Sequence, residues 1–376
     1  MDFNYYLPVN LVFGRGKVDQ LGSITETYGT KALIVTGRNS TKKSGLLDRS
    51  IALLAAAGVE SVVFDQVQQN PLTTTAIEGA ECAKAHACDV VIGLGGGSIM
   101  DCAKAVAFLA VNEGDINDYI FNVKKSDKAL PIILVPTTCG TGSEGNGFAV
   151  LTNPGTNDKK SLRCNAIIPK ASIIDSELME TMPKSILATV GFDALCHNME
   201  AYMSNIAQPM TDIMSVYALQ LIGDSLVALY KGEATEELWD KLTLGSTLGG
   251  MVINIAGVTV AHGMEHPASG LKDIVHGKGL AALTPVIMTK TVETAKEKCS
   301  VISKAIGGTD YTDCVAKINE MLADLDLTIT LGEQGITAED IPWMVENFFK
   351  VSAAGLANHP VLFTKEDIAD IFALAL

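Results

Sequence analysis

The chain has 376 residues, of which 48% are hydrophobic and 19% charged, so it is long enough for two globular domains with a sizeable core. Its formal net charge of -15 argues against nucleic acid or an anionic membrane as the main partner, because those surfaces attract clustered Lys and Arg. Eight scattered cysteines without a Cys-x-x-Cys motif, and an N-terminus without a signal-peptide pattern, favour a reduced cytoplasmic protein.

The first half of the sequence alternates short β-branched runs with helical stretches. Such alternation predicts a parallel sheet covered by helices on both faces. The expected strands lie at 31–36, 61–64, 89–93, 131–135, 148–151 and 171–175, and the expected helices at 43–57, 74–86 and 98–110.

After Pro183 the sequence becomes rich in Ala, Leu, Met and Glu. Helices of typical length with short turns would give about seven to nine helices in this part. We therefore expect an α/β domain at 1–183 and an all-α domain at 184–376. The uncharged stretch 244–264 is as long as a membrane span, but its glycines favour one buried central helix.

A glycine-rich turn, Gly95-Gly96-Gly97-Ser98, lies between the third expected strand and its helix. Exposed backbone amides and the helix dipole at such a turn favour an anion such as a pyrophosphate. The turn is not the usual Gly-x-Gly-x-x-Gly fingerprint, because Ser98 takes the place of the third glycine. Ser98 and Asp101 fit equally well as a helix-capping pair.

A second loop, 136–144, follows the fourth expected strand and contains Thr137, Thr138 and Thr141. Its hydroxyls and glycines suit phosphate, ribose or carboxamide, although a Ser/Thr turn that caps the next element is the alternative. Two such loops at the carboxyl ends of strands in one sheet favour a shared ligand.

Four potential metal ligands, Asp193, His197, His262 and His276, occur in two segments in the second half of the chain. Asp193 and His197 are four residues apart, so a helix would place them on one face, and His262 and His266 share this spacing. His276 follows after a loop. Each histidine alone is more typical of a hydrogen-bonded core residue. Together they predict a catalytic site for Fe(II), Zn(II), Mn(II) or Ni(II) with an open position for substrate.

With these motifs the chain resembles the iron-containing (group III) alcohol dehydrogenases over nearly its whole length. The resemblance implies a nucleotide-binding domain with a dehydroquinate-synthase-like parallel sheet, an all-α metal-binding domain and catalysis between them. The matching motifs are Gly95-Gly-Gly-Ser98-x-x-Asp101-x-Ala-Lys104, Pro136-Thr-Thr-x-Gly-Thr-Gly-Ser-Glu144, Asp193-Ala-Leu-x-His197-x-x-Glu-Ala-Tyr202-x-Ser204, and His262-Gly-x-x-His266-Pro followed by His276-Gly277.

The resemblance also implies roles for single residues. It implies Fe2+, with Zn2+ as an alternative, at Asp193, His197, His262 and His276. His266 matches the family's non-ligand histidine near the nicotinamide and is expected to relay the proton. Lys159 aligns with a lysine near the ribose, although the neighbouring Lys160 leaves that alignment open. The expected NADP- or NAD-binding residues are Gly37, Ser40, Gly95, Gly96, Gly97, Ser98, Thr137, Thr138, Thr141, Lys159 and His266.

One departure from the family concerns coenzyme choice. Many NAD-using relatives have Asp directly after the first expected strand, where this chain has Gly37 followed by Arg38, Ser40, Lys42 and Lys43. Losing the carboxylate removes its repulsion of a 2′-phosphate, which nearby cations and hydroxyls would attract. We therefore expect NADP(H) to be accepted or preferred. The alternative is that these cations are solvated loop charges.

The resulting hypothesis is a metal-dependent NAD(P)(H) alcohol dehydrogenase or aldehyde reductase for small primary alcohols or aldehydes of the butanol, lactaldehyde or propanediol type. The metal would act as a Lewis acid on the substrate oxygen. One alternative is a metal-dependent hydrolase or lyase of a phosphorylated metabolite, and another is a nucleotide-binding sensor. By family analogy we expect a homodimer or larger homo-oligomer, with neither nucleic acid nor membrane as a partner.

Overall fold

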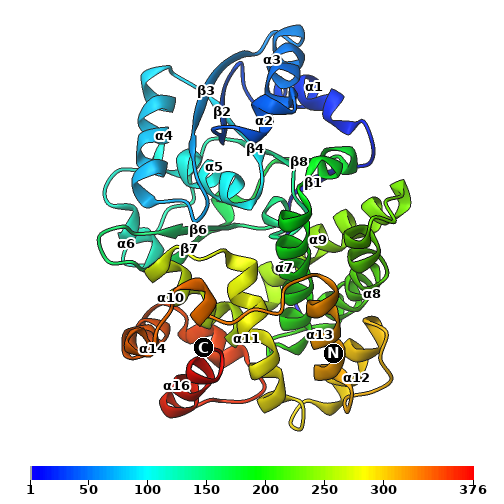
Figure 1. Cartoon of the computed structure of the whole chain (residues 1–376). Coiled ribbons are helices and arrows are strands. Elements are labelled where there is room, and N and C mark those ends of the chain that lie inside the picture. Colours follow the sequence, from blue (N-terminus) through cyan, green and yellow to red (C-terminus); the bar gives the residue numbers. More distant parts are fainter. Residues whose placement is uncertain (1) are drawn as a thin grey trace.

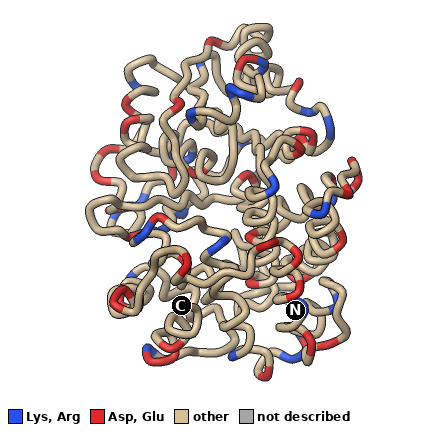
Figure 2. The backbone as a smooth tube through the Cα atoms, in the orientation of Figure 1, with Lys and Arg blue, Asp and Glu red and all other residues tan. Residues whose placement is uncertain are grey.

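The structure is a computed structural model that describes residues 2–376 (Figure 1). In this range every strand precedes residue 175, and from Lys184 onward the regular elements are helices, which confirms the predicted fold class. Acidic and basic residues are dispersed over both parts (Figure 2). The strands are β1 (Asn10–Phe13), β2 (Lys31–Gly37), β3 (Glu60–Val67), β4 (Val90–Gly95), β5 (Ile132–Pro136), β6 (Phe148–Thr152), β7 (Lys159–Arg163) and β8 (Ala171–Ile174).

Six parallel strands form the main sheet, in the order β1-β8-β5-β4-β2-β3. The chain winds outward in one direction from β2 to β3 and in the other direction from β4 to β5, so the topology switches between β2 and β4. The neighbouring carboxyl ends lie at Gly37, Gly95 and Pro136, and Gly95 pairs with Pro136 in register. Ligands of open α/β sheets bind at such a switch point, so the predicted loops are suitably placed.

The sheet is buried on both faces because its strands are apolar on both sides. Along β2, Leu33 and Val35 pack in the cluster that includes α4 and α5, whereas Ala32 and Ile34 pack in the cluster that includes α3. Alternation of side chains along a strand produces this division. The helices of this part are α1 (Leu21–Thr25), α2 (Ser40–Lys43), α3 (Leu46–Ala56), α4 (Thr73–Ala85), α5 (Gly97–Leu109) and α6 (Ile116–Ile120).

Strands β6 and β7 form a separate antiparallel ribbon, which lies between the main sheet and the helical part (Figure 1). The sequence predicted β6 but neither β7 nor β1. Strand β7 reads Lys-Lys-Ser-Leu-Arg, which lacks the apolar alternation that marks a half-buried strand. Strand β1 has only four residues, too few for a periodic signal.

The helical part contains ten α-helices between Lys184 and residue 376, so the predicted seven to nine were too few. The stretch expected as one helix at 244–264 is also broken. Helix α9 ends at Ala256, Gly257 has a φ of 67°, and α10 begins at Val260 after a bend of 101°. The helices are α7 (Lys184–Met203), α8 (Pro209–Lys231), α9 (Glu236–Ala256), α10 (Val260–Lys272), α11 (His276–Thr291), α12 (Lys296–Ala305), α13 (Cys314–Asp324), α14 (Ile341–Val351), α15 (Ala353–Asn358) and α16 (Lys365–Leu374).

Helix α8 is long and apolar enough to cross a membrane, but half of its most apolar window is buried inside the protein. It packs mainly against α7 and α9, and also against α12. A core helix of a globular bundle has this same composition, so the helix carries no argument for a membrane.

Candidate metal centre

One side of helix α7 places carboxylate and imidazole side chains in the interior of the helical part. Asp193, His197 and Glu200 follow one another at spacings of four and three residues, so they lie on one side of α7, and all three are buried. Burying three polar side chains in one place is costly unless they bind one another or a ligand. These side chains of α7 therefore need hydrogen-bonding or ionic partners from other elements.

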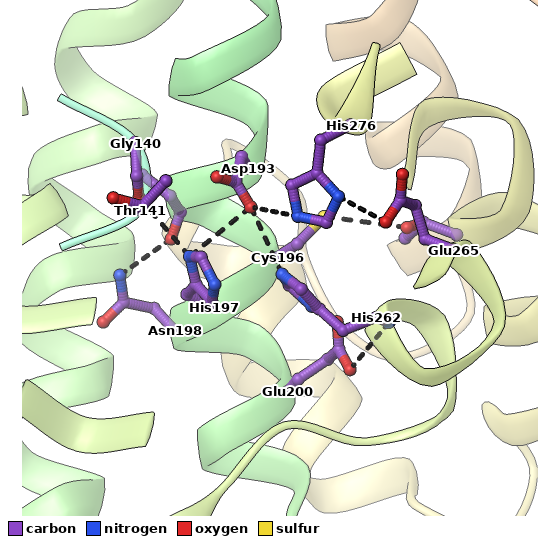
Figure 3. Close-up of polar contacts among 12 residues, drawn as sticks. Gly140, Thr141, Asp193, Cys196, His197, Asn198, Glu200, His262, Glu265 and His276 are labelled. Atoms are coloured by element: carbon purple, nitrogen blue, oxygen red, sulfur yellow. Dashed lines mark hydrogen bonds and ion pairs between the residues drawn. The ribbon is translucent and has the colours of Figure 1, made fainter. Parts of the chain in front are cut away.

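Helices α10 and α11 bring two imidazoles to Asp193 (Figure 3). The Oδ1 atom of Asp193 lies 3.2 Å from Nε2 of His262 and 3.6 Å from Nε2 of His276, the first residue of α11. Each of these three residues offers a ligand atom, and the three atoms lie within 4.8 Å of one another. The sequence prediction that distant segments meet at one carboxylate agrees with this geometry.

Two further carboxylates hold these imidazoles from behind. His262 Nδ1 lies 2.5 Å from Oε1 of Glu200, and His276 Nδ1 contacts Glu265, whose side chain is fully buried. The other oxygen of Glu200 accepts a hydrogen bond of 2.7 Å from the backbone of Thr259. Because a carboxylate at Nδ1 fixes that nitrogen as the donor, Nε2 is left to face Asp193. This donor set fits a divalent ion.

His197, the fourth predicted ligand, lies against the cluster in a different way. Its Nδ1 is 3.5 Å from Oδ1 of Asp193 and 3.3 Å from the carbonyl oxygen of Gly140, and its ring stacks on that of His262 at 4.3 Å. All four predicted residues are thus neighbours, but the tightest group consists of Asp193, His262 and His276.

The buried charges shift one another's protonation. Burial alone would raise the pKa of Asp193, but the charges of His197 and His276 and the bond from His262 hold it well below its usual value. Burial would lower the pKa of His262, yet Glu200 and Asp193 raise it to about 10, whereas burial lowers the pKa of His197 to about 4. An ion that binds here must therefore displace a proton from His262.

One cavity joins this cluster to the predicted nucleotide turn. His197, His262 and His276 line it together with Gly97 and Ser98. Further lining residues are Asn70, Asp101, Thr141, Phe148, Lys159, Ile253 and His266. The predicted metal ligands and part of the predicted dinucleotide site therefore border the same space.

The glycine turn is closely packed against the second loop. A Cβ on Gly96 would lie 3.0 Å from Oγ1 of Thr138, and one on Gly97 would lie 2.2 Å from Cγ2 of Thr141. Gly95 has a φ of 151°, a conformation that side chains rarely adopt. These glycines let the two strand ends approach one another, as the prediction of a shared ligand requires.

The alternative interpretation of Ser98 and Asp101 as a helix-capping pair is wrong. Helix α5 begins at Gly97, and its N-cap is Gly96, which has no side chain to accept a capping hydrogen bond. Asp101 instead accepts hydrogen bonds from Oγ of Ser143, at 2.5 Å, and from the backbone of Val150, at 2.9 Å. A buried carboxylate needs partners, and here the tertiary partners take precedence over the local one.

A second cavity lies at the same edge of the sheet and is lined by Ser40 and Thr137. Gly37 ends β2 there, with Ile99 as its neighbour. Lys42, one of the cations expected to attract a 2′-phosphate, is ion-paired with Asp65.

The structure distinguishes Lys159 from Lys160. The Nζ atom of Lys159 donates to Oδ1 of Asn70 at 2.9 Å and to Oγ of Ser269 at 2.7 Å, and it lies 3.4 Å from Oε2 of Glu265. Lys159 lines the cavity of the metal cluster, whereas Lys160 lines another.

The predicted proton relay, His266, shares the metal cavity. Its ring centroid lies 6.2 Å from that of His276. Burial and the nearby charge of Lys159 hold the pKa of His266 well below its usual value, so the imidazole is neutral at pH 7.

Sequence reasoning missed three polar residues of the site. Glu200 and Glu265 occur three residues after His197 and His262 on the same helices, and this repeated spacing was a usable signal. Asn70 has a left-handed φ of 44° and lies in the loop after β3, where no motif marks it. Only the tertiary structure brings it to Lys159.

Comparison with known proteins gives a consistent result. A sequence profile described as "Iron-containing alcohol dehydrogenase" matches residues 8–176, and one described as "Fe-containing alcohol dehydrogenase family, C-terminal" matches residues 187–376. The chain is 32% identical to a 1,3-propanediol dehydrogenase of Citrobacter freundii, over 99% of this chain and 98% of that protein. It is 28% identical to an NADPH-dependent butanol dehydrogenase of Clostridium saccharobutylicum, over 98% and 96%. A solved alcohol dehydrogenase from an archaeal halo-thermophile of a Red Sea brine pool superposes with a TM-score of 0.95 at 33% identity, covering 100% of this chain and 99% of that chain.

Proposed function

The chain belongs to the iron-containing alcohol dehydrogenase family, and on this premise we propose how its residues share the work of the reaction. It is an NAD(P)-dependent oxidoreductase of the metal-dependent type. We propose that it interconverts small primary alcohols and aldehydes, as the names of the butanol and propanediol dehydrogenases indicate for those relatives. Neither name supports the hydrolase or lyase considered as an alternative.

One observation carries this proposal: the cavity beside the glycine turn is also lined by the histidines of the metal cluster. A dinucleotide held at the turn and a substrate held at the cluster would meet there, and such alignment supplies much of the catalytic effect. We assign dinucleotide binding to residues 1–183 and metal binding to residues 184–376.

We assign the metal to Asp193, His197, His262 and His276. A divalent ion supplies Lewis-acid polarisation of the substrate oxygen when bound, and the nicotinamide supplies or accepts the hydride. The protein contributes orientation, because Glu200 and Glu265 hold two of the imidazoles by their Nδ1 atoms.

His266 is the proposed proton carrier. A neutral imidazole has one free nitrogen that accepts the proton released when an alcohol is oxidised, and it returns the proton in the reverse direction. The low pKa of His266 keeps it in this form at neutral pH. Lys159, fixed by Asn70 and Ser269, is proposed to orient the ribose.

The proposal is tested with metal-loaded protein, NADPH and butanal, by following the near-ultraviolet absorbance of NADPH. Steady oxidation supports a reductase, and NADPH binding without turnover supports the sensor. His266→Ala should slow turnover while the bound metal is retained. Loss of the metal from this variant would make His266 a ligand instead of a proton carrier.

We further propose that NADP(H) is the preferred coenzyme, because Gly37 leaves the end of β2 without a carboxylate. The pairing of Lys42 with Asp65 leaves hydroxyls such as Ser40 and the exposed Arg38 to meet a 2′-phosphate. Gly37→Asp should reverse the preference, and the new side chain fits, since its Cβ would lie 3.3 Å from the flexible end of Ile99 and 3.6 Å from the carbonyl oxygen of Val67, an ordinary contact. A wild-type kcat/KM much higher with NADH than with NADPH would contradict the assignment.

Finally, we propose a homodimer or larger homo-oligomer in the cytoplasm. Ile206 just before α8, and Met210, Ile213 and Tyr217 in its first half, are exposed apolar residues, and an exposed apolar patch marks a protein interface. All eight cysteines are free, as expected in a reducing compartment. Light scattering measures the molar mass of the wild type and of Ile213→Lys. The wild type should be an oligomer and the variant should dissociate, and a monomeric wild type would contradict the proposal.

A further inference from the structure

A third cavity lies next to the metal cavity, and His266 lines both. Its wall is formed by β7 on one side and by the segment around Val351 and Gly355 on the other. Two cationic side chains of β7, Lys160 and Arg163, face this space together with polar Ser161 and Asn122. The two cavities therefore share a wall residue, and the third cavity borders the proposed proton carrier.

The cations of this cavity have no acidic partner. Within residues 2–376, neither Lys160 nor Arg163 forms an ion pair, and Lys160 Nζ donates only to the backbone carbonyl of Val351, at 2.6 Å. The nearby carboxylate of Asp158 is already bound by Lys350 Nζ at 2.6 Å and by Asn347 at 2.7 Å. With three cations and one carboxylate, the local charge is about +2 in a chain whose net charge is -15.

The charge of Arg163 also disfavours that of Lys160. Burial lowers the pKa of Lys160 and the neighbouring charge of Arg163 lowers it further, although the charge of Asp158 partly opposes the shift. The guanidinium of Arg163 lies 4.3 Å from the centre of the Phe148 ring, which also borders the metal cavity. An anion between Lys160 and Arg163 would relieve their repulsion and gain charge-assisted hydrogen bonds.

Lys159 does not compete for such an anion. Its Nζ is already bound by Asn70, Ser269 and Glu265 inside the metal cavity. The adjacent lysines of β7 therefore differ in their surroundings. Lys159 is paired with Glu265 in the metal cavity, whereas Lys160 forms no ion pair.

From this geometry we propose that the third cavity receives a carboxylate at the far end of the substrate, so that the enzyme prefers short ω-hydroxy acids and their aldehydes to unsubstituted alcohols. The inference rests on the proposed function and narrows its substrate class. In the reductive direction, 4-oxobutanoate, NADPH and one proton give 4-hydroxybutanoate and NADP+. The hydride goes to the aldehyde carbon, the proton goes to its oxygen, and the carboxylate is unchanged.

The test compares two aldehydes of equal chain length, 4-oxobutanoate and butanal, with the metal-loaded enzyme and NADPH. We expect kcat/KM to be about tenfold or more higher for the acid, the usual scale of a charge-assisted contact. The methyl ester of 4-oxobutanoate should behave like butanal, because it has the length of the acid without its charge. Calorimetric binding of 4-hydroxybutanoate and butan-1-ol to the enzyme provides a readout independent of turnover.

Variants of Lys160 and Arg163 test whether these two cations cause the preference for 4-oxobutanoate. In Lys160→Met and Arg163→Met the ratio of the two kcat/KM values should fall about tenfold, and Lys160→Arg should restore most of it, since a cation is retained. Lys128→Met is the matched control, because Lys128 is an exposed cation of the loop before β5. Its ratio should equal that of the wild type.

The outcomes separate this inference from the proposed function. If butanal is reduced as efficiently as 4-oxobutanoate, or if the Lys160→Met and Arg163→Met variants keep the wild-type ratio, the carboxylate site is refuted while the dehydrogenase assignment stands. If neither aldehyde is reduced by the metal-loaded protein, both proposals fail together.

Discussion

The two sides of the central cavity are built in opposite ways. The proposed metal side consists of side chains from α7, α10 and α11, and each of the imidazoles of His262 and His276 is held by a second carboxylate. The proposed dinucleotide side consists of backbone at the ends of β4 and β5, where a Cβ on Gly97 would collide with Thr141. The metal side should therefore be sensitive to changes of charge at constant shape, and the dinucleotide side to changes of shape at constant charge.

The largest effect is expected at the centre of the metal side. Asp193→Asn keeps the size of the side chain but removes the only carboxylate in the group of three donors. We expect loss of bound metal and a fall in turnover of about a thousandfold or more, because the Lewis-acid contribution is worth several kcal/mol. Metal analysis after dialysis and steady-state kinetics measure both quantities, with Asp127→Asn on the surface as the control. NADPH binding should persist, and a variant that keeps full metal occupancy would contradict the assignment.

A smaller effect is expected at Glu200, which contacts the proposed ligand His262. Glu200→Gln leaves a group that accepts a hydrogen bond from His262 Nδ1 but carries no charge to stabilise the imidazole. Metal affinity should fall about 10–100-fold, as is usual for such outer partners. Competition with a chelator measures the affinity, and Glu297→Gln on the exposed side of α12 is the matched control. An unchanged affinity would mean that Glu200 serves only the packing of the helices.

The dinucleotide side should respond in the opposite sense. Gly97→Ala adds no charge, but its Cβ would lie 2.2 Å from Cγ2 of Thr141, so Thr141 must be displaced from the glycine turn. We expect NADPH to bind about tenfold more weakly, the scale of 1–2 kcal/mol for a displaced contact, with metal content unchanged. Fluorescence titration of NADPH measures the loss. Gly155→Ala, in the turn between β6 and β7, should bind NADPH normally, and equal losses in both variants would count against a specific role for the turn.

The same contrast explains what could be predicted from sequence. Asp193 and His262 could be identified because their residue types and their spacing to other histidines are apparent in the sequence. The glycine turn could be identified because a run of glycines indicates a special backbone conformation. Strand β7 could not be predicted, since its stability comes from pairing with β6. The capping alternative for Asp101 failed because its carboxylate accepts a tertiary hydrogen bond from Ser143, which no sequence spacing reveals.

Lys104 is an exception to this contrast between side chains and backbone, because the proposed dinucleotide side depends on its side chain. It is fully buried on α5, and its Nζ donates to Oγ of Ser143 at 2.7 Å, to Oδ1 of Asn146 at 2.9 Å and to the carbonyl oxygen of Phe148 at 2.8 Å. These bonds hold the loop after β5 against the helix that begins at the glycine turn. Burial lowers the pKa of Lys104 to about 8, although Asp101 and Glu144 partly oppose the shift.

This lowered pKa predicts a pH dependence of stability, the smallest of the expected effects. The pKa of an exposed lysine is 10.5, so between pH 8 and 10.5 the unfolded chain binds more protons than the folded protein at this position. Its contribution to the free energy of unfolding should therefore be constant below pH 8 and rise across that window, by on the order of 1–2 kcal/mol. Because other groups titrate there too, the measurement is the difference between wild type and Lys104→Met in urea unfolding at pH 8 and pH 10, with Lys128→Met as the control. An identical pH dependence in wild type and Lys104→Met would mean that Lys104 keeps its proton as readily as an exposed lysine, and that the loop is held by shape alone.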